Sequence, residues 1–268
     1  ARELLPRWGA QVARVDTTCL QAVEQALSAD RTALLVVETP ATPALGISDL
    51  AALGELCEAR GVMLACDTTF ATPILQKPLA LGAGLVVHST TKYIGGHSDL
   101  LGGAVVEADP GKWLDVVDRF RTRAGASPSA FDCWLLTRSR PTLPWRVRAQ
   151  SEHAARIANF LADHPGVAEV MYPGLEDHPG HAVAARQMSG FGAMLAFRVA
   201  AGRRAAMGVT ERTRLFTRAT SLGGVESLIE HRASVEGPDS GIPEDLLRLS
   251  VGLEHPDDLV ADLAAALG

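Results

Sequence analysis

Residues 85–99 read LVVHSTTKYIGGHSD, and this stretch decides how the first half of the chain folds. Its opening residues, 85–88, form a short and mostly apolar run, which predicts a strand of a parallel sheet buried on both faces. The run ends at a cluster of hydroxyl side chains, followed by a lysine and two glycines. The sequence therefore predicts a strand whose carboxyl end leads into a tight loop that contains Lys92.

Similar apolar runs lie on both sides of this stretch, at residues 33–37, 62–66 and 103–106. Between the first two runs, Ser48 and Asp49 offer an N-cap for a helix that continues to Arg60, and Gly61 ends that helix. The order strand, helix, strand predicts right-handed crossovers and a mostly parallel sheet flanked by helices. The expected fold class is therefore α/β.

The second half of the chain has a different pattern. A helical region from about residue 110 to residue 161 is interrupted by Pro141 and Pro144, and a long amphipathic helix is expected after these prolines. Beyond it we expect strands at 167–171 and 193–197 and helices at 182–188 and 256–267. We therefore predict a large α/β domain over residues 1–140 and a smaller α+β domain over residues 141–268.

Composition excludes several classes of function. The 268 residues include 25 basic and 31 acidic side chains, a net charge of −6, and no long basic run, so no nucleic acid partner is expected. The sequence has neither a signal peptide nor an apolar run long enough to cross a bilayer, so no membrane partner is expected. Its four cysteines form no C-x-x-C pair, which is typical of reduced thiols in a cytoplasmic protein.

Two segments place reactive side chains just beyond predicted strands. Asp67 follows the run at 62–66, and Lys92 follows the run at 85–88. Ligands of open α/β sheets bind outside the carboxyl ends of the strands, so both side chains are candidates for one site. A buried lysine with a lowered pKa can form a Schiff base, and nearby hydroxyls, here Ser89 and Thr91, suit phosphate oxygens. Taken singly, Asp67 could be a turn aspartate and Lys92 an exposed loop lysine.

A third segment places an arginine in a strand-like run, since residues 246–251 read LLRLSV. The planar fork of Arg248 is suited to holding a carboxylate with two hydrogen bonds, and the alternative is an edge-strand arginine in solvent. The three segments together offer an acid for a ring nitrogen, hydroxyls for a phosphate, an amine for an aldehyde and a guanidinium for a carboxylate. This combination describes a site for pyridoxal 5′-phosphate (PLP) and an amino acid.

The segment 86–99 resembles the cofactor signature of the Cys/Met-metabolism, or trans-sulfuration, family of PLP-dependent enzymes. That family includes cystathionine γ-synthase, cystathionine γ-lyase, cystathionine β-lyase and methionine γ-lyase. Further blocks resemble the family in its order, namely ETP at 38–40, DTTFATP at 67–73, YPGL at 172–175, SLGG at 221–224 and RLSVG at 248–252. The resemblance implies the type I PLP-dependent transferase fold and an enzyme that eliminates or replaces a group at the γ-carbon of a sulfur amino acid.

The resemblance also implies roles for single residues. Lys92 would attach covalently to PLP and later move a proton between substrate carbons. Asp67 would keep the ring nitrogen protonated, and Ser221 and Arg248 would bind the substrate carboxylate. The remaining cofactor contacts that it implies are Thr42, Thr69, Ser89 and Thr91. Family members are usually homotetramers, dimers of dimers whose active sites are shared between subunits.

The chain departs from the family pattern in several places. Thr42 replaces an Asn that contacts the cofactor, Thr220 replaces a Glu that often precedes S-L-G-G, and Arg232 replaces the Pro of E-H-P-A-S. Arg232 adds a charge near the expected entrance to the site. Family chains also carry a long segment ahead of the position matching Ala1, with further contacts to the phosphate and the ring. We therefore expect the chain to lack the family's N-terminal segment.

Two alternatives remain open from the sequence. The chain could be a truncated, catalytically incompetent homologue, or a subunit that completes the site of a partner. It could also be a nucleotide-dependent oxidoreductase, although Gly82-x-Gly84 lacks a third glycine in register, and Trp113 rather than Ser or Thr follows Gly111-Lys112. No metal is expected, because the sequence contains no paired-Cys or H-E-x-x-H spacing.

Overall fold

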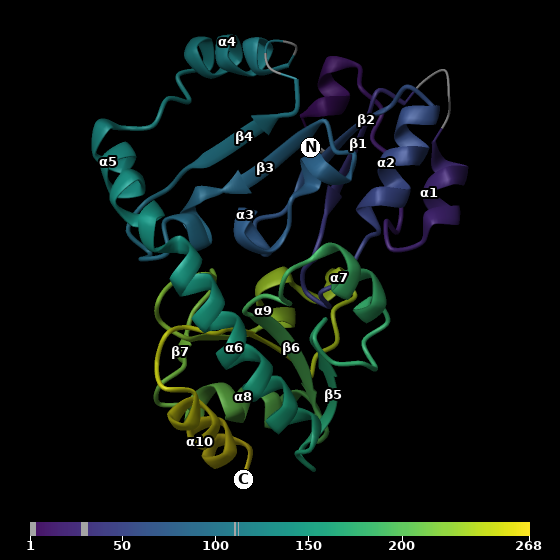
Figure 1. The fold of residues 1–268 in the computed structure, drawn as a ribbon. Coiled ribbons are helices and arrows are strands. Elements are labelled where there is room, and N and C mark those ends of the chain that lie inside the picture. Colours follow the sequence, from purple (N-terminus) through teal and green to yellow (C-terminus); the bar gives the residue numbers. More distant parts are fainter. Residues whose placement is uncertain (1–3, 28–31, 110, 112) are drawn as a thin grey trace.

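The structure is a computed structural model that describes residues 4–27, 32–109, 111 and 113–268. Two β-sheets lie one above the other in Figure 1, and the long helix α6 (Leu143–Ala162) runs from the region of the upper sheet into the lower body. Within the described residues, none of the helices combines the length and the apolar character that crossing a bilayer requires.

The first half of the chain forms a four-stranded sheet in the order β1-β2-β3-β4. β1, β2 and β3 pair in parallel, and β4 is antiparallel to β3. The mostly parallel sheet predicted from the sequence is therefore confirmed. The strands are β1 (Leu34–Glu38), β2 (Met63–Asp67), β3 (Leu85–Ser89) and β4 (Gly103–Glu107).

The helix between β1 and β2 forms as its end signals predict. α2 (Leu50–Ala59) begins at Asp49, whose carboxylate accepts a hydrogen bond from the Ala52 amide at 3.3 Å, and Gly61 follows it with φ +63°. Its buried residues join a core cluster with apolar residues of β1 and β2. The other helical elements of this half are 3₁₀ turns at Leu5–Trp8 and Pro78–Leu81, α1 (Leu20–Ala26), α3 (Thr72–Leu75), the turn Thr90–Ile94, α4 (Leu114–Ala124) and α5 (Ala130–Ser139).

The helical region predicted up to residue 161 is divided differently from the prediction. α4 ends at Gly125, which adopts φ +70°, and α5 begins at Ser129, whose hydroxyl accepts a hydrogen bond from the Asp132 amide at 3.0 Å. Pro141 lies in a 3₁₀ turn, Arg140–Thr142. Pro144 lies inside the first turn of α6, so the prediction that this helix follows both prolines was wrong. The first turn tolerates proline because its N–H groups have no helical partner.

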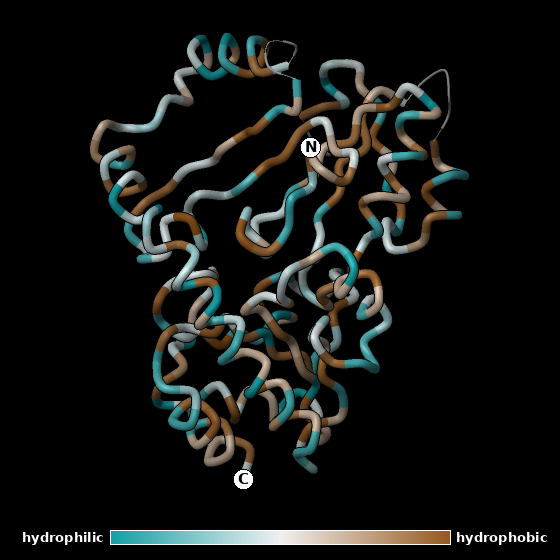
Figure 2. Tube along the Cα trace, viewed as in Figure 1, coloured by the Kyte–Doolittle hydropathy of each residue, from teal (hydrophilic) through white to brown (hydrophobic). Residues whose placement is uncertain are grey.

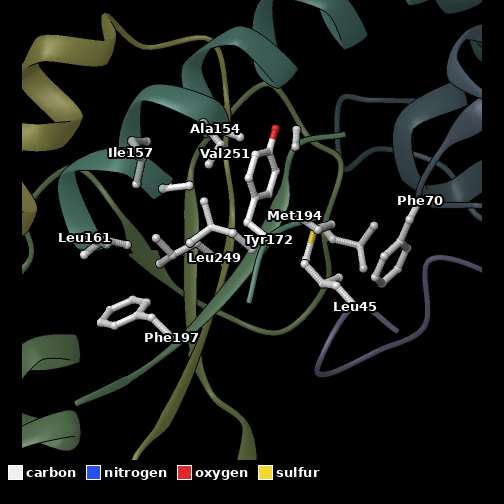
Figure 3. Packing of buried hydrophobic residues seen from close by; sticks show 14 of the residues in the cluster. Leu45, Phe70, Ala154, Ile157, Leu161, Tyr172, Met194, Phe197, Leu249 and Val251 are labelled. Carbon is white, nitrogen blue, oxygen red and sulfur yellow. The ribbon is translucent and has the colours of Figure 1, made fainter. Parts of the chain in front are cut away.

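The second half forms a five-stranded sheet in the order β5-β6-β9-β8-β7. Helix α10 contacts both α6 and α8, each of which packs on β6, and the apolar core in Figure 3 fills the space between helices and strands. The prediction missed β7, β8, α8 and α9. The remaining elements are β5 (Val167–Met171), β6 (Met194–Val199), β7 (Thr217–Arg218), β8 (Leu228–His231), β9 (Leu246–Ser250), α7 (His181–Gln187), α8 (Gly202–Arg212), α9 (Arg232–Glu236), a 3₁₀ turn at Pro238–Ser240 and α10 (Pro256–Leu267).

The two sheets have separate apolar clusters, one around β1–β3 and the other around the second sheet and α6. Brown, hydrophobic stretches run along β3 and β4 in Figure 2, whereas α4 on the outer rim is largely hydrophilic. We propose that each sheet is the centre of one domain, with the boundary after residue 140, where α5 gives way to α6.

Candidate active site

Lys92 lies in the turn that follows β3, and its side chain points toward the second half of the chain. The turn is helical except at Lys92 itself, whose dihedral angles are φ −88° and ψ −130°. Its ammonium Nζ donates a hydrogen bond to Ser221 Oγ at 2.9 Å. Burial lowers the pKa of Lys92, the neighbouring Arg248 charge lowers it further, and Glu230 opposes the shift. The lysine is thus half-buried and bonded, unlike the exposed loop lysine that the sequence left open.

Helix α6 holds this turn in place through a buried arginine. Arg146 Nη1 donates to the Tyr93 carbonyl at 2.8 Å, and Nη2 donates to the Ile94 carbonyl at 3.4 Å and to the Ser139 carbonyl at 3.3 Å. Gly223 also fits closely against the turn, because a Cβ there would lie 2.7 Å from the Tyr93 nitrogen. The position also requires φ +78°, which favours glycine. The backbone around Lys92 is therefore fixed by hydrogen bonds from Arg146 and by close packing against Gly223.

Asp67 is the last residue of β2, and it lies beside β3 because Asp67 pairs with Val87 in parallel register. Its Oδ1 accepts a hydrogen bond from the Thr69 amide at 2.9 Å, and Thr69 Oγ1 accepts one from the Ser89 amide at 2.8 Å. Thr69 thus connects Asp67, at the end of β2, with Ser89, which directly precedes the turn that contains Lys92. The acid and the amine follow adjacent strand ends, as the sequence predicts.

The electrostatics beside Asp67 keep its neighbours uncharged. Burial, with a further contribution from the Asp67 charge, raises the pKa of Cys66 to about 12. Burial lowers the pKa of His88, and the Asp67 charge opposes this shift only in part. His88 is therefore neutral at pH 7, and we propose that the carboxylate of Asp67 faces the ligand at these strand ends.

Thr91 makes a contact that the sequence did not indicate. Its hydroxyl accepts a hydrogen bond from the Gly102 amide at 3.0 Å and reaches the Gly102 carbonyl at 3.3 Å. The Thr91 hydroxyl thus holds the chain that enters β4, and a phosphate would have to share this hydroxyl with the backbone. Ser89 is half-buried at the end of β3, and its amide is bound to Thr69.

Arg248 lies in β9, a central strand flanked by β6 and β8, so the edge-strand alternative is wrong. Its Nη1 donates to Thr42 Oγ1 at 3.2 Å, and its Nη2 donates to the Ser221 carbonyl at 3.2 Å. The same Nη2 lies 2.5 Å from Glu230 Oε2 in an ion pair. Ser221 therefore connects Arg248, through its carbonyl, to Lys92, through its hydroxyl. Thr42, expected to contact the cofactor, binds the arginine here.

Comparison with known proteins identifies the family. The family model described as Cys/Met metabolism PLP-dependent enzyme matches residues 1–268. The chain belongs to this family. It is a PLP-dependent trans-sulfuration enzyme that acts on a small amino acid, and the alternative of a nucleotide-dependent oxidoreductase is therefore wrong.

Relatives within the family carry names of both synthases and lyases. The chain is 50% identical to cystathionine γ-synthase of Mycobacterium tuberculosis, over 99% of this chain and 69% of that protein. It is 40% identical to cystathionine γ-lyase of Bacillus subtilis, over 99% of this chain and 71% of that protein. Among solved structures, cystathionine γ-synthase of Xanthomonas oryzae pv. oryzae in complex with aminoacrylate and cysteine matches with a TM-score of 0.95, at 42% identity, over 99% of this chain and 70% of the other.

The side chains of Lys92 and Asp67 at the strand ends, and of Arg248 within β9, suit the cofactor and an amino acid substrate of this family. An amine with a lowered pKa suits an aldehyde, a carboxylate suits a protonated ring nitrogen, and a buried guanidinium suits an amino acid carboxylate. The amine is that of Lys92, the carboxylate is that of Asp67 and the guanidinium is that of Arg248. In the described part of the chain, three or more His, Cys, Asp or Glu side chains never gather as a metal site would require.

Sequence reasoning missed two buried charges that shape this family site. Glu230 interrupts the apolar run of β8 and pairs with Arg248, and an acid within such a run is a signal of a buried charged partner. Arg146 lies in a stretch rich in basic side chains, residues 138–148, which is typical of an exposed helix face, yet only 5% of its surface is accessible. Neither partner could be read from the local sequence, because each contact joins residues distant in the chain.

Proposed function

We propose that this enzyme catalyses γ-replacement on an O-acyl-L-homoserine with cysteine, with γ-elimination as the competing reaction of the same site. The observation that carries the proposal is the continuous contact from Lys92 through Ser221 to Arg248. These contacts bring the Lys92 amine near the Arg248 guanidinium, and a reaction at the α-carbon of an amino acid needs one group to transfer a proton and another to bind the carboxylate. The higher identity to a γ-synthase than to a γ-lyase supports replacement as the main reaction.

Each proposed residue has a separate task. Arg248 binds the substrate carboxylate with two hydrogen bonds, assisted by Ser221, and so orients the α-carbon toward Lys92. When bound, PLP supplies a ring that withdraws electrons and acidifies the Cα–H bond of the amino acid. The Lys92 amine takes the proton from Cα and moves it to and from the neighbouring carbon. Asp67 holds the proton on the ring nitrogen, and Thr42, Thr69, Ser89 and Thr91 complete the proposed cofactor contacts.

A groove of about 690 Å³ beside Ser221 gives the side chain of the substrate a place. Its lining includes Thr220 and Glu226, and the Glu226 carboxylate accepts a hydrogen bond from the Ser98 hydroxyl. Thr220 offers a hydroxyl where many relatives offer a carboxylate, so the amino group of an incoming cysteine has one fewer charged partner. This favours some elimination beside replacement.

Product analysis of the PLP-loaded enzyme tests the proposal. With O-acetyl- or O-succinyl-L-homoserine and cysteine we expect cystathionine as the main product and 2-oxobutanoate as the minor one. Cystathionine and methionine supplied alone are the comparison substrates. Exclusive release of 2-oxobutanoate from cystathionine would instead assign the lyase reaction. Absence of every product from a protein that retains PLP would favour the subunit that completes a partner's site.

We also propose that the enzyme is a cytoplasmic homotetramer with active sites shared between subunits. α4 has no buried residue and α5 has a single one, Ser139. Large apolar side chains on these helices are exposed, including Phe120 at 61%, Phe131 at 65% and Trp134 at 57%. Asp132, next to Phe131, lines the groove beside Ser221, so a second copy packed on α5 would border the substrate site.

Charged substitutions on α5 test this assembly. We expect F131E/W134E to convert the tetramer into smaller species and to reduce turnover, because two carboxylates would be buried in the interface. Light scattering coupled to size exclusion measures the mass. L215E, at a residue that is 42% exposed in the second half of the chain, is the matched control. A tetramer that persists in F131E/W134E would exclude α5 from the interface.

A further inference from the structure

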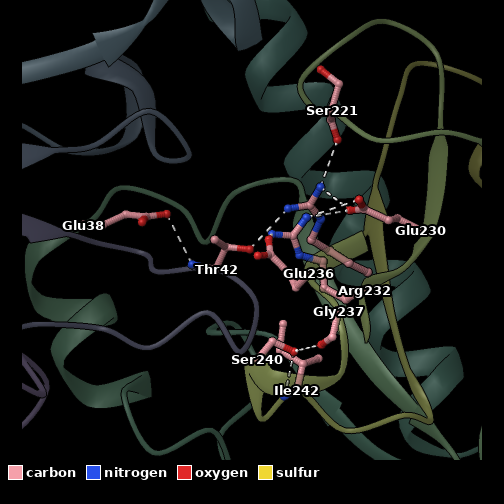
Figure 4. A network of polar contacts seen from close by, with 10 residues as sticks. Glu38, Thr42, Ser221, Glu230, Arg232, Glu236, Gly237, Ser240 and Ile242 are labelled. Carbon is pink, nitrogen blue, oxygen red and sulfur yellow. Dashed lines mark hydrogen bonds and ion pairs between the residues drawn. The ribbon is translucent and has the colours of Figure 1, made fainter. Parts of the chain in front are cut away.

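A second guanidinium lies beside Arg248 and shares its acidic partner. Arg232, the first residue of α9, places Nη1 at 3.2 Å from Oε1 and 3.3 Å from Oε2 of Glu230. Its Nη2 contacts the carboxylate of Glu236 at the end of the same helix (Figure 4). Glu230 is therefore paired with two cations, and its side chain is only 4% exposed.

The sharing of Glu230 matters because two carboxylates, that of Glu230 and that of the substrate, compete for the guanidinium of Arg248. A carboxylate as buried as that of Glu230 needs a paired cation, since an isolated buried charge is strongly unfavourable. If Arg248 were its only cation, the guanidinium would be drawn fully to Glu230, and a substrate carboxylate would have to displace that acid. Arg232 supplies two further hydrogen bonds to the same carboxylate, at 3.2 and 3.3 Å, and so reduces the demand of Glu230 on Arg248.

The exposure of the two arginines fits this division of tasks. The Arg248 side chain is 6% exposed, and its Nη2 pairs with Glu230 at 2.5 Å. The same guanidinium also donates to Thr42 Oγ1 and to the Ser221 carbonyl, each at 3.2 Å. The Arg232 side chain is 12% exposed and contacts the carboxylates of Glu230 and Glu236. Arg232 is thus placed to act on the substrate through Glu230 rather than by direct contact.

We propose that Arg232 is a positioning residue that neutralises Glu230 and thereby keeps Arg248 available for the α-carboxylate of the amino acid substrate. The proposal rests on the proposed function of Arg248 and extends it to the charge behind that residue. It predicts that the affinity of the enzyme for an amino acid carboxylate depends on the balance of charge around Glu230. The stability of helix α9 should not affect this affinity.

Ligand binding by the PLP-loaded enzyme tests this separately from turnover. The probes are L-norvaline, which has no leaving group, and L-norvalinamide, which lacks the carboxylate, each titrated by calorimetry. In wild type we expect the acid to bind more tightly than the amide. R232Q should weaken binding of the acid by about tenfold and leave the amide unaffected, a change equivalent to about 1.4 kcal/mol. For a reacting substrate, KM should rise by a similar factor with kcat nearly unchanged.

A double-mutant cycle identifies Glu230 as the intermediary. E230Q removes the competing charge, so E230Q/R232Q should restore binding of L-norvaline toward the wild-type value, and R232K should restore it in part. If Arg232 merely stabilised α9, the double variant would bind no better than R232Q, and E236Q would reproduce the loss because it removes a bond of the same helix. Either result would overturn the proposal.

The failures of the two proposals can be told apart. Equal binding of L-norvaline and L-norvalinamide by wild type would contradict the proposed role of Arg248 and this inference with it. A wild-type preference for the acid that persists undiminished in R232Q would overturn the inference alone. R203Q, which breaks the exposed 3.0 Å ion pair between Arg203 and Glu244, is the matched control and should bind both ligands as wild type does.

Discussion

K92A is expected to abolish turnover, with a loss of at least about 10³-fold, because the substitution removes both the attachment of the cofactor and the group that transfers the proton. Lys92 is held by Ser221 and is half-buried. Alanine has no side-chain amine that could bond to the cofactor aldehyde. Absorbance of the lysine-bound cofactor should disappear, and borohydride reduction followed by mass spectrometry should no longer find a modified residue 92.

The pH dependence of covalent attachment provides a second measurement on Lys92. Burial, followed by the Arg248 charge, lowers the pKa of the lysine, so the neutral amine is available at lower pH than in an exposed lysine. Addition to the aldehyde requires this neutral form. The initial rate of PLP uptake should therefore rise with pH and reach half its maximum below the ordinary lysine value of about 10.4.

An exposed lysine provides the control for both measurements. Lys77 precedes a 3₁₀ turn, and its side chain faces solvent. K77A should therefore retain turnover, the absorbance of the bound cofactor and the same pH profile as wild type. A covalent adduct that persists in K92A, or one that disappears in K77A, would assign the cofactor to another amine.

Much of the fold could be predicted because its signals are local. α2 begins at an aspartate that caps the helix and is followed by Gly61, and both signals lie within the segment itself. β5 occupies residues 167–171, the range predicted from its sequence. The direction of β4 could not be predicted in this way. Its antiparallel pairing with β3 depends on how the chain returns to the sheet and not on residues 103–107 alone.

β8 shows why other elements escaped prediction. Its four residues include Glu230 and His231, which mask the apolar pattern of a buried strand. The acid is tolerated because Arg248 and Arg232 neutralise it. The strand is also fixed by pairing with β9, which lies farther along the chain. Neither condition can be read from residues 228–231 in isolation.

The single residues of the candidate site could be predicted from the sequence, but the contacts between them could not. Asp67, Lys92 and Arg248 are unusual residues at the ends of or within apolar runs, which made them visible. The bond between Lys92 and Ser221 joins residues 129 positions apart, and no local pattern encodes it. The engagement of the Thr91 hydroxyl with Gly102 was hidden for the same reason, because it depends on where β4 enters the sheet.

D67N is expected to separate the binding of the cofactor from its use. A neutral amide cannot stabilise a positive charge on the ring nitrogen, so the ring should withdraw electrons less strongly from the α-carbon. Loss of such a fixed, partly buried charge predicts a decrease in kcat of about 10²–10³-fold. Lys92 remains in D67N, so covalent attachment of PLP should persist, and its absorbance spectrum should change as the ring loses its proton.

The appropriate control is an aspartate that has a similar hydrogen bond but a structural task. Asp49 caps α2 and accepts a hydrogen bond from the Ala52 amide, as Asp67 accepts one from Thr69. D49N should leave kcat unaltered, because asparagine also serves as an N-cap. Thermal unfolding should place both variants close to wild type. Wild-type kcat in D67N would show that the charge at the end of β2 only shapes a turn, and the ring nitrogen would then need another partner.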